Sequence, residues 1–189
     1  GIANLLIENG EESIVKVKAD KGSPERVKVK VRNGVLMISS PGNGANIDNL
    51  IVSIGNSNLK RIEMTGGGNL TSSSPITTEQ LTLKIGSGSN VDVQAETQLL
   101  EASFDRSNNI TLSGKAVTFQ LDLGANSNLK AIELETTSCI AEVTGNSNAE
   151  VTVLTKLDAY IKRNSNLYVK GNPETSTEEK DNSSGIHHQ

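Results

Sequence analysis

Apolar and polar residues alternate with a period of two along most of the chain after residue 80. Residues 81–85, for example, read Leu-Thr-Leu-Lys-Ile, with apolar side chains at the odd positions. Successive side chains of a β-strand point to opposite faces, so this alternation predicts strands that bury one face. No stretch shows the 3.6-residue periodicity of an amphipathic helix with caps. The pattern therefore predicts an all-β fold.

A short turn signature, a Ser-Asn or Asn-Asn pair, recurs between these strands. It is found at Ser57-Asn58, Ser89-Asn90, Asn108-Asn109, Ser127-Asn128, Ser147-Asn148 and Ser165-Asn166. From Asn90 onwards the second asparagine recurs at 109, 128, 148 and 166, with spacings of 19, 19, 20 and 18 residues. A fixed period of this length is typical of a repeat architecture in which each repeat forms one coil.

The residues that flank the recurring asparagine confirm the register. Nine residues before it stand Leu81, Leu100, Phe119, Cys139 and Leu157. Seven residues before it stand Leu83, Ala102, Leu121, Ala141 and Ala159. The positions five before, one after and three after are also apolar in all five repeats. An antiparallel sandwich would not keep these columns in step, and a leucine-rich repeat requires its own Leu and Asn pattern. The sequence thus predicts a single-stranded, right-handed parallel β-helix with coils of ~19 residues, stacked ~4.8 Å apart.

The two ends of the chain differ from the repeats. Val29 and Val31 alternate with basic residues, and Asn33-Gly34 then leads into a second apolar run, which predicts a hairpin with a type I′ turn. We expect residues 1–173 to form one domain, with N-terminal cap strands in 1–48 and coils in 49–173. Residues 174–189 are polar and lack periodicity, so we expect a disordered tail.

Composition and charge exclude several functional classes. Aromatic residues make up only 2% of the chain, so the core must be aliphatic. The net charge is −4, of which the tail contributes −3 through one basic and four acidic residues, and no basic stripe favours nucleic-acid binding. No apolar run reaches the 18 residues that predict a transmembrane helix. The single cysteine, Cys139, rules out an intramolecular disulfide.

The end of the repeat region resembles a known family. The segment Leu167-Tyr-Val-Lys-Gly-Asn-Pro173 is similar to the last coil of the head GIN domain, described as an autotransporter-adhesin head of Bacteroidetes-type envelope proteins. Residues 33–38 resemble its early strand, and the likeness covers roughly residues 10–173. Family corners are usually Ser-Gly-x-Gly, whereas several here are Asn-Ser-Asn. The resemblance implies a parallel β-helix, no assigned reaction and export to the periplasm, the outer-membrane surface or the exterior, with the signal peptide removed.

The candidate chemistry is sparse. Both histidines, His187 and His188, lie outside the repeats, and Cys139 falls in an apolar column, so a nucleophilic site is not expected. We expect neither a metal nor a cofactor. The alternative is a carbohydrate-active hydrolase or lyase. Asp122 and Glu142 share a column in neighbouring coils, and two nearby carboxyls are what glycoside hydrolysis requires.

The remaining hints point to a binding surface. Tyr160, Tyr168 and Ile140 occupy outward positions near the C-terminal end of the repeats, where tyrosines suit contacts with a sugar or a protein. The competing interpretation is that the tail covers them. We therefore expect a non-catalytic, exported cell-envelope module that binds a cell-surface glycan or protein, and a structural spacer is a second alternative. We also expect Asn90, Asn109, Asn128, Asn148 and Asn166 to stack as a ladder. Asparagine can serve there because its amide bonds backbone groups left unpaired by the turn, or because it tolerates left-handed backbone geometry. The glycine corners of the family favour the second reason.

Overall fold

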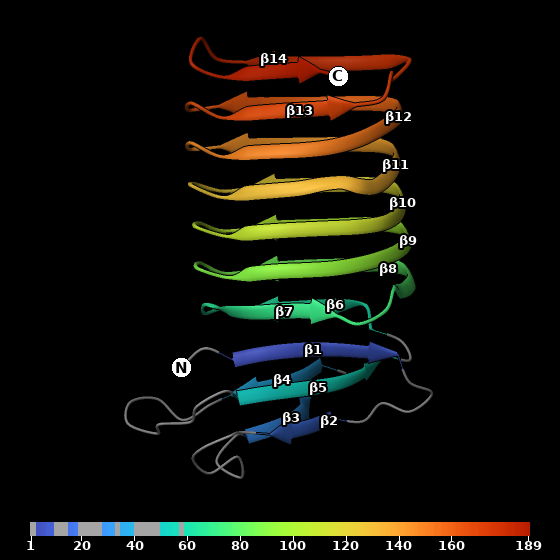
Figure 1. Cartoon of the computed structure of the whole chain (residues 1–189), viewed down its shortest axis with the longest axis vertical. Coiled ribbons are helices and arrows are strands. Elements are labelled where there is room, and N and C mark those ends of the chain that lie inside the picture. Colours follow the sequence, from blue (N-terminus) through green and yellow to red (C-terminus); the bar gives the residue numbers. More distant parts are fainter. Residues whose placement is uncertain (1–2, 10–14, 19–27, 33–34, 40–49, 57–58) are drawn as a thin grey trace.

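The strands of this protein stack into a parallel β-solenoid of about seven turns (Figure 1). The computed structural model describes residues 3–9, 15–18, 28–32, 35–39, 50–56 and 59–189. Every regular element in this part of the chain is a strand. None of the described residues belongs to a helix that could cross a bilayer. The parallel β-helix expected from the repeat is confirmed.

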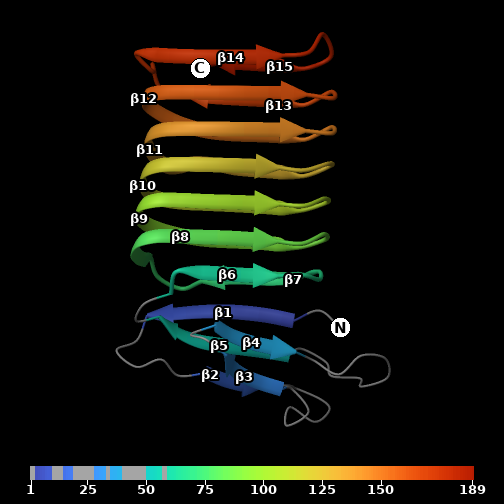
Figure 2. The same ribbon diagram turned by 180° about the vertical axis from the view of Figure 1, so that it is seen from behind.

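Four long strands form the regular middle of the solenoid. They are β9 (Asn90–Phe104), β10 (Asn109–Leu123), β11 (Asn128–Thr144) and β12 (Asn148–Lys162). Each runs along one side of the solenoid, bends, and returns along the other side (Figures 1 and 2). We call the sheet formed by the first halves the first sheet, and the sheet formed by the second halves the second sheet. Each coil therefore adds one rung to each sheet.

The rungs on both sides of the long strands are shorter. Before them come β6 (Arg61–Met64), β7 (Gly68–Ser72) and β8 (Ile76–Ile85). After them comes β13 (Asn166–Lys170), which pairs with the first half of β12. The strands β7 and β13 belong to the first sheet, whereas β6 and β8 belong to the second. Residues 65–80 thus contribute β7 to the first sheet and the beginning of β8 to the second.

The expected apolar columns form the interior. Parallel pairing places Leu81 beside Leu100, and then Phe119, Cys139 and Leu157 follow in register. Ala141 pairs with Ala159, and both side chains are fully buried. Burying one leucine-sized side chain contributes about 1.5–3 kcal/mol. Because every column is apolar in all five repeats, this aliphatic stack accounts for a core without aromatic bulk, except for the buried Phe104 and Phe119.

A column of buried polar residues runs through the corner between the two sheets, next to the column of ladder asparagines. The residue before each of the five expected ladder asparagines is buried, namely Ser89, Asn108, Ser127, Ser147 and Ser165. Ser184, which precedes Gly185, continues this buried column in the last coil. The backbone N–H of one member donates to the side-chain oxygen of the next, as from Ser127 to Ser147 at 3.1 Å. The side chain therefore satisfies a backbone donor that the turn leaves without a strand partner.

Our expectation about backbone geometry at the corner was wrong. The ladder asparagines begin strands and are extended, whereas a left-handed residue stands two positions earlier. That position is Gly88, Ser107, Asn126, Asn146 or Asn164, with φ between 57° and 76°. In two corners the residue before that one, Gly145 or Arg163, is left-handed as well. Asparagine and glycine tolerate this region best, which explains their abundance in the corner.

The N-terminal region contains a rung that the pattern did not predict. The strand β1 (Ala3–Asn9) lies between β5 (Leu50–Asn56) and β7 in the first sheet and is parallel to both. The strand β2 (Val15–Lys18) pairs with β5 in the antiparallel direction on its other side. Residues 3–9 therefore belong to the solenoid itself and not to a cap over it.

The expected hairpin is present. The strands β3 (Lys28–Arg32) and β4 (Val35–Ser39) pair in the antiparallel direction as a separate two-stranded sheet. The turn predicted at Asn33-Gly34 lies outside the described residues.

The expectation of a disordered tail was also wrong. The strand β14 (Thr175–Lys180) pairs with the second half of β12, and β15 (Gly185–His188) pairs with β13. This last coil lacks an apolar signature because most of the positions that continue the inner columns hold polar side chains, with Ile186 as an apolar exception. Ser176 continues the column of Leu157, and Glu178 continues that of Ala159. A polar coil at the end of the stack shields the core from water, as terminal repeats of solenoids do.

Candidate functional site

A row of asparagine amides runs along the outer surface of the first sheet. Asn69 donates to Asn4 at 2.6 Å, Asn90 to Asn69 at 3.0 Å, and Asn109 to Asn90 at 3.4 Å. Farther along, Asn148 donates to Asn128 at 3.3 Å and Asn166 to Asn148 at 3.1 Å. The expected ladder is confirmed, and the structure extends it to Asn69 and Asn4.

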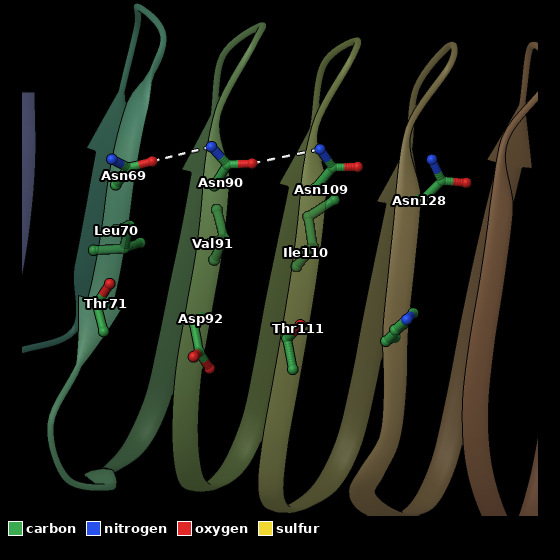
Figure 3. Close-up of a pocket in the computed structure, with 11 residues that line it drawn as sticks. Asn69, Leu70, Thr71, Asn90, Val91, Asp92, Asn109, Ile110, Thr111 and Asn128 are labelled. Atoms are coloured by element: carbon green, nitrogen blue, oxygen red, sulfur yellow. Dashed lines mark hydrogen bonds between the residues drawn. The ribbon is translucent and has the colours of Figure 1, made fainter. Parts of the chain in front are cut away.

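The ladder is interrupted between Asn109 and Asn128. The two residues are register partners, but no amide hydrogen bond joins them, and Figure 3 shows the dashed contacts ending at Asn109. An asparagine side chain has two donor hydrogens and an oxygen with two lone pairs. Each ladder bond uses one donor and one lone pair, so each rung from Asn69 to Asn128 keeps a donor and an acceptor at the surface. The interruption leaves one more acceptor, on Asn109, and one more donor, on Asn128.

A second polar row lies two residues farther along the same strands. It consists of Thr71, Asp92, Thr111 and Lys130, which are register partners in successive rungs. All four side chains are exposed. The two rows line an open groove of about 500 Å³ on the outer surface of the first sheet, from Asn69 to Lys130 (Figure 3). The groove offers amides, hydroxyls, one carboxylate and one ammonium group, which can bind a polar ligand by hydrogen bonds.

The carboxylates of the alternative hypothesis lie on the second sheet. Asp122 and Glu142 are register partners, so the predicted proximity is confirmed, and the Ser103 hydroxyl donates to Asp122 at 3.3 Å. Side chains in one column of a parallel sheet point in the same direction. The carboxyls of a glycoside hydrolase instead flank the scissile bond. The groove lies on the first sheet, so neither Asp122 nor Glu142 lines it.

The three candidate partner-binding residues do not form one surface. Ile140 and Tyr160 lie in adjacent columns of the second sheet, and Ile140 is exposed. Tyr168 lies on the first sheet, where its ring stacks on His187 with centroids 4.8 Å apart. The C-terminal segment runs beside both tyrosines, because Glu179 of β14 is the register partner of Tyr160 and His187 of β15 stacks on Tyr168. The spacing from Asn166 could have separated them, because Tyr160 precedes the corner and Tyr168 follows it.

The other candidate groups are occupied or unreactive. Burial raises the pKa of the Cys139 thiol to about 12, and nearby Asp158 adds to this effect, so no thiolate forms near neutral pH. His188 contacts Glu178 at 2.9 Å, while His187 stacks on Tyr168. Among the described residues, no three His, Cys, Asp or Glu side chains are grouped to hold a metal ion.

One carboxylate anchors the last coil. Asp181 accepts hydrogen bonds from the backbone N–H of Arg163 at 2.7 Å and from that of Ser183 at 3.1 Å. These bonds, with further ones from the Ser184 and Ser183 hydroxyls, hold the pKa of Asp181 well below its usual range. The ionised form of Asp181 therefore ties the final turn to the corner of the preceding coil.

Comparisons with known proteins agree with this geometry. A family model described as "putative auto-transporter adhesin, head GIN domain" matches residues 1–173. The last coil from Glu174 onwards lies beyond that match. No curated protein matches the chain.

Solved structures of low sequence identity share the fold. A putative adhesin from Bacteroides fragilis superposes with a TM-score of 0.90 at 19% identity, covering 100% of this chain and 89% of that one. One from Parabacteroides merdae gives 0.75 at 16% identity, covering 100% and 89%. A protein from Parabacteroides distasonis, described as a putative lipid binding protein, gives 0.69 at 18% identity, covering 100% and 87%.

Proposed function

The chain belongs to the family of putative auto-transporter adhesin head GIN domains, and we propose that it is an exported, non-catalytic module of the bacterial cell envelope that binds a surface glycan through the groove of its first sheet. The observation that carries the proposal is the pair of polar rows in that groove. Each rung presents an amide with a remaining donor and acceptor, next to a hydroxyl or charged group. Sugar hydroxyls both donate and accept, so they match such a surface.

The ligand class follows from the side chains that reach the surface. Amides, hydroxyls and single charges match polar ligands better than they match acyl chains. The rows also run across the coils, along the axis of the solenoid, so a linear chain of sugars could contact several rungs at once. Contacts repeated over several rungs add their binding energies, which compensates for the weakness of each exposed hydrogen bond.

The test uses two matched double variants and a panel of glycans and surface polysaccharides. Thr111→Ala with Lys130→Ala removes two groups of the second polar row without touching the ladder or the core. Thr77→Ala with Lys84→Ala removes the same two types of side chain from exposed positions of the second sheet. A net hydrogen bond is worth about 0.5–1.5 kcal/mol. We therefore expect the first variant to bind roughly tenfold more weakly and the second to bind like the parent.

Three results would contradict the proposal. Equal losses in the two variants would place the ligand elsewhere. Binding of a protein or a lipid in place of any glycan would assign another ligand class. Absence of binding to every partner would favour the structural spacer.

A further inference from the structure

The strand β1 occupies a rung that the local chain cannot supply. In the regular coils each first-sheet strand pairs with the strand one repeat away, as β10 does with β9 and β11. The strand β5 instead does not pair with β7, the next first-sheet strand in sequence. β1, from more than 40 residues earlier, lies between them (Figures 1 and 2). Without β1, the backbone groups along the facing edges of β5 and β7 would have no strand partner inside the stack.

The contacts of β1 are those of an ordinary rung. Residues 3–9 pair in register with 50–56 on one side, and residues 3–7 pair with 68–72 on the other. Ile7 is buried in the core with 1% exposure, and Leu5 packs against it. The backbone carbonyl of Ile7 accepts from the Ser73 N–H at 2.9 Å, and Asn4 accepts from Asn69. The slot between β5 and β7 therefore fits a strand with apolar side chains pointing inward, as Leu5 and Ile7 do, and an amide pointing outward, as Asn4 does.

The strand β2 defines the unit that would move with β1. It pairs with the far side of β5, so β1 and β2 hold β5 between them. Only residues 10–14 connect the two strands, and such a link spans at most about 20 Å, so β2 stays close to the place where β1 pairs. We therefore treat β1 and β2 as one unit, called the β1–β2 clasp, which holds β5 between its two strands.

We infer that the slot between β5 and β7 accepts β1 from a second copy of this chain, so that two copies exchange their β1–β2 clasps and form a swapped dimer. Every contact of β1 described above is formed equally when the strand comes from another copy, so the two forms differ mainly in chain connectivity. Exchange then competes with self-pairing when the chain concentration approaches the effective concentration of the tethered strand, which is on the order of 1 mM for a flexible tether. Copies crowded on one envelope surface would favour exchange.

The experiment traps the foreign strand with a disulfide. Leu6 and Thr71 are outward-facing register partners. Their Cα atoms are separated by one strand spacing, ~4.8 Å, which lies within the range a disulfide spans. One full-length chain carries Leu6→Cys and another carries Thr71→Cys. The native Cys139 is buried and stays in both. The two chains are unfolded in denaturant, mixed, refolded together at high concentration and oxidised. A covalent heterodimer then reports β1 of one copy in the slot of the other.

Two controls make every outcome decisive. A Thr111→Cys chain, with its thiol in the same outer row two rungs away, should give several-fold less heterodimer with the Leu6→Cys chain. The double variant Leu6→Cys/Thr71→Cys, refolded at high dilution, should close its disulfide within one chain. If it closes but the mixed chains yield no more heterodimer than the Thr111→Cys control, exchange does not occur. If it does not close, the register of β1 is wrong and the inference fails with it.

Discussion

Replacing Asn108 by serine should stabilise the protein. Asn108 occupies the buried column that is otherwise serine in the neighbouring coils, and its side-chain oxygen accepts the Ser89 N–H at 2.8 Å. Its Nδ2 is the one buried side-chain nitrogen or oxygen atom within the described part of the chain that has no hydrogen-bond partner. An unsatisfied buried donor of this kind costs about 1–3 kcal/mol.

Serine would keep a side-chain oxygen that can accept the Ser89 N–H, and it would remove the Nδ2 that has no partner. In the next coil the hydroxyl of Ser127 accepts the Asn108 N–H at 3.1 Å, so a serine oxygen reaches its partner across the same coil spacing. The smaller side chain leaves a small void, which offsets part of the gain because cavity volume costs roughly 24 cal/mol per Å³. We expect a net gain of about 1 kcal/mol, equivalent to a rise in Tm of roughly 2–4 °C for a chain of this size.

The assay is urea unfolding followed by circular dichroism, with two variants of Ser127 as controls. Ser127→Asn introduces an unpartnered amide donor into the same column, and Ser127→Ala removes the acceptor of the Asn108 N–H. Each should lower the free energy of unfolding by about 1–3 kcal/mol. If Asn108→Ser proves no more stable than the parent while both controls are destabilised, the Asn108 amide has a partner and the reasoning is refuted.

Three further predictions test other parts of the structure. Ala141→Lys places an unpaired charge among fully buried side chains, so the protein should unfold; a melting temperature within a degree or two of the parent would contradict the register. Asp122→Asn with Glu142→Gln should leave glycan binding unchanged, and loss of any polysaccharide turnover in this variant would overturn the non-catalytic assignment. Because the folded-state pKa of Asp181 is lowered, its stabilising effect is complete above the unfolded value of about 3.9 and is lost as the pH falls through the lower folded value. The hydrogen-exchange protection factors of residues 175–188, which correct for the intrinsic effect of pH on exchange, should therefore fall below about pH 4, and Asp181→Asn should show the lower protection already at neutral pH.

The repeats were predictable because each coil needs an inward side chain at the same positions. The column of Leu81, Leu100 and Phe119 determines the register as soon as the period is known, and the structure confirms it. The place of β1 was not predictable in this way, since its pairing with β5 and β7 follows no repeat spacing. The last coil was missed because Glu178 and Ser176 occupy positions where the pattern requires apolar residues.

The residues that line the groove follow a simple pattern in the sequence. Thr71, Asp92, Thr111 and Lys130 each stand two residues after an asparagine of the ladder, so alternation alone places them on the same outer surface. Asn69 was overlooked because it stands 21 residues before Asn90, outside the closer spacing of the later coils. Concavity, in contrast, depends on how the sheet curves, and no local pattern in the sequence encodes that.

The shared register of the middle coils makes the length of this protein adjustable in whole steps. Removing residues 109–127 would join Asn108 directly to Asn128, and the new neighbours would still present a buried corner residue, a ladder asparagine and matching inner columns. The module would become shorter by one strand spacing, ~4.8 Å, with the same ends. Duplicating the segment would lengthen it by the same amount. A change of half a coil would instead bring the first sheet's residues against the second sheet's. Gain or loss of whole coils can thus alter the length of the module while its fold and both ends remain intact.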